Sequence, residues 1–251
     1  MAGEFWLSDR QWAVIEPLLP KNQPGAHRVD DRRVISGIVH VLKAGCRWQD
    51  CPAVYGPPTT IYNRFRRWTI KGVWRRLFAA LVALSPDDVH MIDSTSAKAH
   101  RSAGGGKGGP KFQAIGRSRG GRTTKIHAVV DGQGRLIAFE ITAGQRGDAP
   151  FARSLLEQLP HARLCLADTA YDADKLRKFL IERGTTPVIP NNPTRKRIQP
   201  FDPQAYKQRN LVERMFCRLK DWRRVATRYD KLAAIFASAV CIAAIIIWWA
   251  Q

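Results

Sequence analysis

Acidic residues are scarce in this sequence. Asp and Glu together number 21 against 41 Lys and Arg, which gives a formal net charge of +20 at pH 7. Nothing in fold stability requires such an excess of one sign, and the self-repulsion of like charges opposes compactness. The imbalance therefore argues against a merely soluble basic protein. It predicts a polyanionic partner, because this charge is typical of chains that bind nucleic acid.

Cysteines are few, odd in number and scattered. The five stand at Cys46, Cys51, Cys165, Cys217 and Cys241. Their arrangement excludes a disulfide framework and indicates a reducing compartment. Cys46 and Cys51 are close, but no second Cys or His pair stands at zinc-ligand spacing, which weighs against a structural zinc site. No basic segment followed by an apolar one opens the chain, so we expect no signal peptide and a cytoplasmic location.

Long apolar runs are absent except at the end of the chain. From Leu232 to Ala250 every residue is apolar apart from Ser238, and this run is long enough to span a bilayer. The alternative is a terminal helix that is hydrophobic on every side because it lies in a domain core. We favour burial and expect no membrane partner, since the many alanines of this run suit close helix packing.

The first part of the chain is typical of helices. Ser8 is a suitable cap for a helix that Pro20 would stop, and residues 30–43 carry apolar side chains at helical spacing before Gly45. We therefore expect a helical, helix-turn-helix-like DNA-binding module over residues 1–86.

One helix of this module is a candidate for DNA contact. Thr59 or Thr60 is expected to cap it, and its outer surface is basic. The candidate contacts there are Arg64, Arg66 and Arg67. A charged helix face is often only solvated, so DNA contact and simple solvation are the two alternatives for this segment.

After residue 86 short apolar runs alternate with helical patterns. The expected strands are Val89–Asp93, Lys125–Val130, Leu136–Thr142, Leu164–Ala167 and Thr186–Ile189. The expected helices are Ala149–Leu159, Ala173–Arg183, one that carries Glu213, and the terminal apolar helix. This order predicts an α/β domain with a mixed sheet flanked by helices over residues 87–251.

Two carboxylates follow apolar runs of this domain. Asp93 and Asp168 are each expected near the end of a strand, where they converge if the strands are neighbours. Two carboxylates at such a short distance repel one another unless a cation lies between them. Magnesium prefers carboxylate oxygen as its ligand. Two such ions would assist an in-line phosphoryl displacement, with Glu213 as third acid. The alternative is that each Asp only caps a turn.

A cluster of charged residues surrounds Glu213. Arg209, Glu213 and Lys220 are spaced to share one helix face, and Tyr206 precedes them. The same helix brings further arginines with almost no matching acids, among them Arg214 and Arg218. An ordinary salt-bridged helix stripe is the alternative, but the excess of bases indicates phosphate binding.

The string formed by Tyr206, Arg209, Glu213 and Lys220, written Y-x-x-R-x-x-x-E-x-x-x-x-x-x-K, resembles the signature of insertion-sequence DDE transposases, particularly the insertion-sequence-five superfamily. Further segments are similar to that family. They are Met91–Thr95, Thr123–His127, Gly144–Asp148, Ala167–Asp172, and, in the helical part, Leu7–Trp12, Cys46–Trp48 and Trp68.

The resemblance implies a ribonuclease-H-like catalytic fold in which Asp93, Asp168 and Glu213 hold two Mg²⁺ ions, with Mn²⁺ as a substitute. Asp172 is a competitor for the second acid, and we keep Asp168. The implied partners are double-stranded transposon ends and target DNA, bound by at least a homodimer. The implied DNA contacts are Tyr206, Arg209, Lys220, Lys125, His127, Arg214, Arg218 and the arginines of the N-terminal helix.

We expect cleavage at the element's end followed by attack of the freed 3′-hydroxyl on target DNA. Three rivals remain: a metal-dependent nuclease that cuts but never joins, a DNA-binding regulator without catalysis, and a membrane-anchored basic protein.

Overall fold

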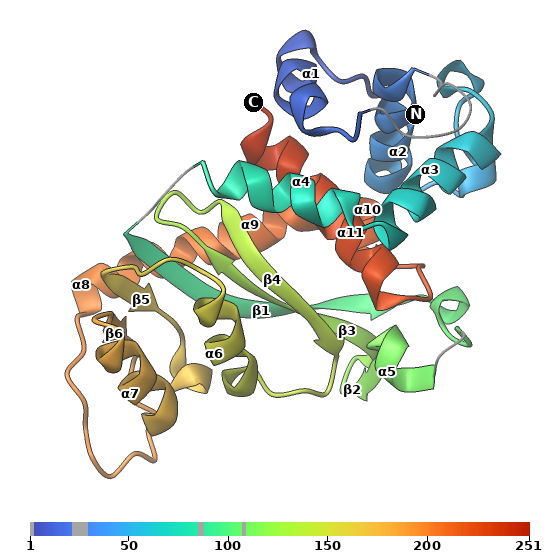
Figure 1. Cartoon of the computed structure of the whole chain (residues 1–251). Coiled ribbons are helices and arrows are strands. Elements are labelled where there is room, and N and C mark those ends of the chain that lie inside the picture. Colours follow the sequence, from blue (N-terminus) through green and yellow to red (C-terminus); the bar gives the residue numbers. More distant parts are fainter. Residues whose placement is uncertain (1–2, 22–29, 85–87, 107–108) are drawn as a thin grey trace. The chain divides into compact units, whose positions relative to one another are not determined.

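The computed structural model describes residues 3–21, 30–84, 88–106 and 109–251, apart from the side chains of residues 110 and 111 (Figure 1). The chain divides into two compact units. We call Met1–Leu84, Ala99–Gln113 and Arg218–Gln251 the helical unit, and Ser85–Lys98 and Ala114–Cys217 the sheet unit. The domain boundary expected between residues 86 and 87 lies outside the described residues.

The helical unit begins with two helices that the sequence predicted. Helix α1 (Asp9–Ile15) starts at a capping box in which the Ser8 side chain and Gln11 satisfy each other's backbone NH groups. Helix α2 (Asp31–Ala44) is capped by Asp30 and ends at Gly45 with φ +77°, a left-handed conformation that glycine adopts without strain. Both predictions are confirmed.

Helix α3 (Pro58–Ile70) is followed by α4 (Val73–Val82). The expected cap at Thr59 or Thr60 is wrong, because the helix starts earlier, with Pro57 as N-cap and Pro58 at its first position. Proline is favoured there, since its missing NH would have no partner within the helix.

The end of the chain is part of the helical unit. Helix α11 (Ala233–Ala244) packs against α2, α3 and α4 and continues into a π-helical turn over Ile245–Trp249. Residues from Phe236 to Ala244 are buried, which confirms the expected burial of this segment. Among the described residues, no helix has both the length and the apolar character needed to cross a membrane. The sequence had grouped this segment with the catalytic domain; that functional division stays a prediction.

The sheet unit contains a mixed sheet. Its strands are β1 (Val89–Ala99), β2 (Gly116–Ser118), β3 (Gly121–Val130), β4 (Leu136–Ala143), β5 (Leu164–Leu166) and β6 (Thr186–Val188). The order runs β3-β1-β5-β6, with β2 and β4 both paired to β3. Strands β1 to β4 pair in antiparallel fashion, while β5 joins β1 and β6 in parallel. This confirms an α/β fold with a mixed sheet.

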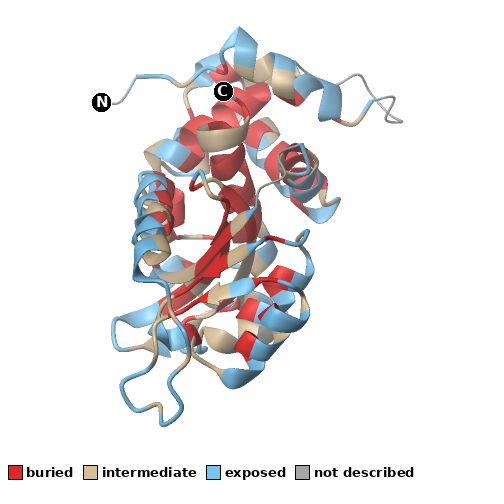
Figure 2. Ribbon diagram, turned by 90° about the vertical axis from the view of Figure 1, so that its left-hand side faces the viewer, coloured by how far each residue is buried: buried red, intermediate tan, exposed pale blue. Residues whose placement is uncertain are grey.

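Helices flank this sheet. They are α6 (Ala149–Glu157), α7 (Asp174–Glu182), α8 (Pro203–Tyr206) and α9 (Asn210–Lys220). The last residues of α9, from Arg218 on, belong to the helical unit. Figure 1 shows α6 and α9 on opposite faces of the sheet, and Figure 2 shows that its strands are largely buried.

The remaining elements are short. The helical unit also holds α5 (Gly109–Gln113), α10 (Arg223–Ala226) and the two-residue β7 (Thr227–Arg228). The 3-10 turns are Glu16–Leu18, Trp48–Asp50, Ala53–Tyr55, Arg101–Ala103, Thr169–Tyr171 and Lys207–Arg209.

Strand β1 is longer than the sequence predicted. The expectation ended it at Asp93, but it continues to Ala99 because β3 pairs with it from Met91 to Lys98. Asp93 therefore lies in the middle of a strand. The polar residues that follow it, from Ser94 to Ser96, concealed the strand in an apolar-run analysis.

Candidate active site

Asp93 lies on β1 with a part-buried carboxylate. Its Oδ1 accepts a hydrogen bond from the Ser94 backbone NH at 2.7 Å, and its Oδ2 accepts one from Nη1 of Arg209 at 2.9 Å. Arg209 is 116 residues away in the chain. The fold thus brings the acid of the first matching segment to a base of the Y-x-x-R signature.

Arg209 connects Asp93 with Glu213. Its Nη2 donates to Oε1 of Glu213 at 2.6 Å, while its Nη1 is held by Asp93. Arg209 ends the 3-10 turn that precedes α9, so of the three charged residues expected on one helix only Glu213 and Lys220 lie on α9. The guanidinium also lies 5.7 Å from the centre of the Tyr206 ring. One cluster is therefore formed by Asp93, Tyr206, Arg209 and Glu213. We call this cluster, together with Asp168, the acid edge.

Asp168 follows β5, as predicted. Strands β1 and β5 are parallel, with Met91 opposite Leu166. Asp93 and Asp168 each stand two residues beyond those partners, so Asp168 follows the strand that neighbours β1, and its charge acts on the Asp93 carboxyl. Asp168 accepts from the backbone NH of Ala170 at 2.9 Å, which means that it also caps a turn.

The surroundings of Asp93 disfavour the charged form of its carboxyl group. Burial raises the pKa of the Asp93 carboxyl above its usual value, and the nearby Asp168 raises it further. The Ser94 NH and Arg209 act in the opposite direction without cancelling the effect of burial. A second cation beside Asp93 and Asp168 would relieve this repulsion.

The acids are not gathered into a ready-made metal cage. Within residues 3–21, 30–84, 88–106 and 109–251, no three His, Cys, Asp or Glu side chains stand close enough to hold a metal ion. At the acid edge the Arg209 guanidinium lies between Asp93 and Glu213. The donor set nevertheless suits a hard divalent cation, because it consists of carboxylate oxygens whose charges repel at Asp93 and Asp168.

Asp172, the alternative candidate for the second acid, already has partners away from the acid edge. Its side chain has no exposed surface and forms ion pairs with Nε of Arg177 at 2.7 Å and Nε of Arg195 at 2.8 Å. The Asn192 backbone NH donates to it at 2.7 Å. Asp172 therefore fastens the loop after β6 to α7, and Asp168 remains the better second acid.

Three of the predicted DNA contacts are placed where DNA cannot reach them readily. Arg64 is buried, forms an ion pair with Asp31 and stacks over Trp68 at 4.9 Å. Lys125 is mostly buried and pairs with an acid. His127 is fully buried, and burial lowers its pKa to about 4. We correct these three assignments, because periodicity did not reveal which bases already have buried partners.

The other basic residues are placed differently. Arg66, Arg67, Arg214 and Arg218 are exposed. Lys220 is the last residue of α9 and is half-buried. For these residues DNA contact stays a prediction.

Three residues close to the acid edge, Ser94, Asp148 and Tyr171, are absent from the predicted site residues. The Ser94 hydroxyl donates to Oδ1 of Asp148 at 2.6 Å. Tyr171 is buried, and its pKa is raised above the usual range first by burial and then by three acids, Asp148, Asp93 and Asp168. Asp148 stands in the segment 144–148, whose resemblance to the family was the one signal that could have identified it.

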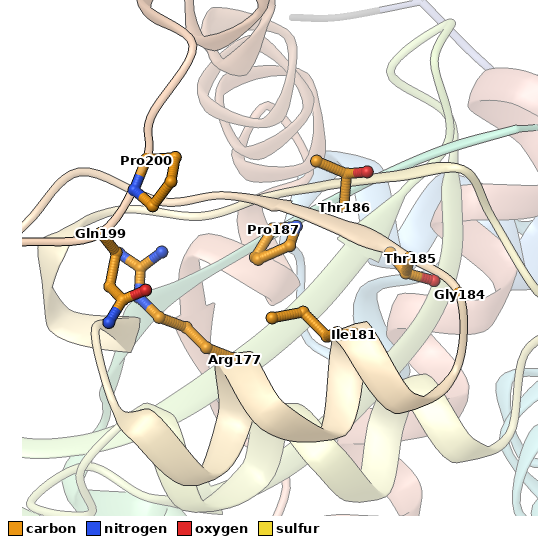
Figure 3. A pocket seen from close by; sticks show the side chains of 8 residues that line it. All are labelled: Arg177, Ile181, Gly184, Thr185, Thr186, Pro187, Gln199 and Pro200. Carbon is orange, nitrogen blue, oxygen red and sulfur yellow. The ribbon is translucent and has the colours of Figure 1, made fainter.

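A pocket of the sheet unit lies apart from these acids. Figure 3 shows that α7, β6 and the segment of Gln199 and Pro200 line it. The Arg177 side chain at its wall is occupied by Asp172 and by the carbonyl of Ile189. This pocket contains none of the acid-edge residues.

Comparison with known proteins gives two family matches. Residues 84–248 match the family described as "Transposase DDE domain", and residues 7–78 match "Putative transposase of IS4/5 family".

Two curated relatives belong to insertion sequences. The chain is 42% identical over 127 residues to a "Putative transposase for insertion sequence element IS6501" of Brucella ovis, which covers 50% of this chain and 98% of that relative. It is 41% identical over 85 residues to the "Insertion element IS402 uncharacterized 16.2 kDa protein" of Burkholderia cepacia, covering 31% of this chain and 58% of that relative.

One solved structure shares the fold at low identity. The piggyBac transposase in a synaptic complex with hairpin DNA matches with a TM-score of 0.52 and 14% identity, over 98% of this chain and 71% of that one. The family match spans more than half of the sequence, and the chain covers nearly all of the Brucella relative. The chain therefore belongs to the insertion-sequence transposases that carry a DDE domain.

Proposed function

We propose that this transposase binds the terminal inverted repeats of an insertion sequence, hydrolyses a phosphodiester bond at each end, and joins the freed 3′-hydroxyls to target DNA. The observation that carries this proposal is the acid edge, where Arg209 pairs both with Asp93, 116 residues away in the chain, and with Glu213, while the charge of Asp168 acts on Asp93.

Asp93, Asp168 and Glu213 would hold two divalent metal ions, with Mg²⁺ as the natural pair and Mn²⁺ as a substitute. Such ions supply charge neutralisation at the reacting phosphate and acidify a water nucleophile. The carboxylates fix their positions, and the Ser94 NH orients Asp93 for this task.

Arg209 would change partners when DNA binds. Its guanidinium neutralises Asp93 and Glu213 in the free protein. Once cations take over that role, its planar fork of NH donors is free for a phosphate, which arginine binds in bidentate geometry. Tyr206 supports it by packing against the guanidinium.

The surface bases would bind the flanking DNA. Arg214 and Arg218 extend the basic face of α9, and Arg66 and Arg67 lie on the exposed side of α3. Each phosphate contact releases counterions, so binding should weaken steeply with salt. Two ends must meet for joining, which requires at least a dimer.

The decisive experiment uses the purified chain with labelled DNA that carries the inverted repeats flanking its reading frame. Cleavage at the ends in Mg²⁺, its loss in EDTA, and its loss in Asp93→Ala with end binding retained are the expected results. Retained cleavage by Asp93→Ala would refute the assignment.

A second substrate separates joining from cutting. A pre-cut end with a free 3′-hydroxyl should be inserted into plasmid DNA by a transposase. A chain that cleaves uncut ends but never forms this joined product would be a nuclease of the same fold.

A further inference from the structure

Asp148 joins two strands of the sheet unit, β1 and β3, from the N-terminal end of α6. Its Oδ1 accepts a hydrogen bond from the Ser94 hydroxyl at 2.6 Å. The same oxygen forms an ion pair with the Lys125 ammonium at 3.0 Å. The same oxygen lies 3.4 Å from Nδ1 of His127, whose Nε2 lies 2.8 Å from the Thr142 hydroxyl. One carboxylate thus links β1 and β3 to the start of α6, whereas the buried Nδ1 of His127 forms no hydrogen bond with it. We call these residues the brace.

The turn before Asp148 is held firmly. The Lys125 ammonium donates to the carbonyl of Arg146 at 2.8 Å, and the Arg146 NH donates to the carbonyl of Ala143 at 3.0 Å. A Cβ at Gly144 would lie 1.8 Å from Oγ1 of Thr123, so only glycine fits there. The turn therefore fixes where the Asp148 carboxylate lies.

Ser94 connects the brace to the acid edge. Consecutive residues of a strand point to opposite faces, so Asp93 projects toward Arg209 while Ser94 projects toward α6. The Ser94 NH is the donor that holds Oδ1 of Asp93, and the Ser94 hydroxyl is held by Asp148. A displacement of Ser94 would therefore turn the Asp93 carboxylate.

Tyr171 shows how close the brace lies to both acids. Its side chain is buried, and its phenol interacts with the charges of Asp148, Asp93 and Asp168. The phenol is therefore held neutral, and the charges of all three carboxylates act on it. The brace is part of the same local structure as the acid edge.

We propose that Asp148 is a positioning residue of the transposase reaction, which acts through Ser94 to set the orientation of the Asp93 carboxylate for metal binding. This inference rests on the proposed function. Lys125 neutralises Asp148 and holds its turn, so the T-T-K-I-H and G-Q-R-G-D segments serve a common purpose that is separate from DNA contact.

Glu140 offers a matched control. It lies on β4 opposite His127, and it accepts a hydrogen bond from Ser154 of α6 at 3.2 Å. It is thus an acid that joins the same sheet to the same helix without a hydrogen bond to Ser94. A merely structural tie between sheet and helix would behave alike in both variants.

The first test measures metal binding without catalysis. Mn²⁺ is titrated into the purified full chain, and free Mn²⁺ is followed by electron paramagnetic resonance. Asp148→Asn should weaken Mn²⁺ binding about tenfold or more, as removal of groups that orient metal ligands commonly does. Glu140→Gln should stay within about twofold of the wild type, and both variants should bind end DNA like the wild type.

The second test asks whether Asp148 acts through Ser94. Ser94→Ala alone should also weaken Mn²⁺ binding, and Asp148→Asn should add less than about twofold in that background, because contacting residues of one network are not additive. Ser96→Ala, two residues along the same strand, is the control and should leave Mn²⁺ binding unchanged. If Asp148→Asn does not fold in a urea titration, Ser94→Ala against Ser96→Ala decides the matter.

The outcomes separate the two proposals. Wild-type protein that binds Mn²⁺ and cleaves, together with an Asp148→Asn variant of unchanged Mn²⁺ affinity, would overturn the positioning role alone. The positioning role would also be overturned if the fold-losses of Mn²⁺ affinity caused by Ser94→Ala and by Asp148→Asn multiplied in the double variant. A wild-type chain that neither binds Mn²⁺ nor cleaves would overturn the proposed function and this inference with it.

Discussion

Asp93 and Asp172 are both held by arginine, yet their carboxylates differ in how fully they are satisfied. Asp172 has two arginine partners and a backbone NH, which together outweigh its burial and lower its pKa to about 2. Asp93 has one arginine and one backbone NH, and burial and Asp168 keep its pKa above the usual value.

The difference separates a structural carboxylate from a candidate catalytic one. At Asp172 the surrounding charges are complete, so the site has nothing to bind. At Asp93 the charged form is disfavoured beside a second acid, which is the condition under which a bound cation gains most. The predictions that follow test this distinction in decreasing order of effect.

Asp93→Asn should separate activity from stability. Metal-dependent cleavage is expected to fall on the order of 1000-fold, because a carboxylate that would hold a metal ion is lost. The free energy of unfolding should change by only about 1 kcal/mol, since the lost Arg209 pair is offset by reduced repulsion with Asp168. Cleavage of labelled end DNA and urea unfolding measure the two effects. Cleavage within tenfold of the wild type would contradict this prediction.

Asp172→Asn should show the opposite pattern. The free energy of unfolding is expected to fall by about 3 to 5 kcal/mol, because the substitution leaves Arg177 buried without its counter-charge and removes one of the two acids that pair with Arg195. Urea titration measures the change. Asp174→Asn is the control, because its carboxylate is exposed and pairs with Arg195; we expect an effect under about 1 kcal/mol. A loss at Asp172 no larger than the loss at Asp174 would remove the comparison.

The lowered pKa of Asp172 also predicts how the free energy of unfolding depends on pH. Asp172 has a pKa of about 2 in the folded chain and near the ordinary value of 3.8 when unfolded, so its contribution to the free energy of unfolding is fully present above the higher value. The contribution should be lost as the pH falls through about 2, because the unfolded chain then binds the proton first. Urea midpoints of the wild type and Asp172→Asn, measured between pH 6 and 2, should therefore converge on acidification. A constant gap between them would show that charge is not the cause.

Arg209→Lys sharpens the comparison at the acid edge. A lysine provides a point charge and cannot bridge Asp93 and Glu213 or grip a phosphate with a planar fork. We expect cleavage to fall roughly 100-fold, as misplacement of a reacting group commonly costs, with stability little changed. Arg195→Lys serves as control and should lower stability with less effect on cleavage by the folded protein. Equal cleavage by Arg209→Lys and wild type would exclude a bridging role.

The smallest expected effects concern the DNA-binding surface. Arg66→Gln and Arg67→Gln should each weaken end binding a few-fold and reduce the slope of log affinity against log salt by about 1. Unfolding should not change, because both residues are exposed. Arg64→Gln is the control: it should lower stability, since Asp31 would lose its buried partner. An unchanged salt slope for Arg66→Gln and Arg67→Gln would remove α3 from the DNA-binding surface.

Local patterns predicted most of the elements. The capping box at Ser8, the left-handed Gly45 and the hairpin between β3 and β4 follow from rules that involve only near neighbours in the chain. The length of β1 did not follow, because its second half is polar and is a strand only through its pairing with β3. The buried role of Arg64 was equally hidden, since Asp31 lies 33 residues away.

The sequence by itself determined the excess of bases and the candidate residues for the chemistry: the acids Asp93, Asp168 and Glu213, and the signature that contains Arg209. Tertiary structure alone decided how they are used, because charge is satisfied by neighbours in space. It gave Asp172 two arginines and left Asp93 strained beside Asp168. It also turned Asp148 toward Ser94, a contact between residues 54 positions apart that no local pattern specifies.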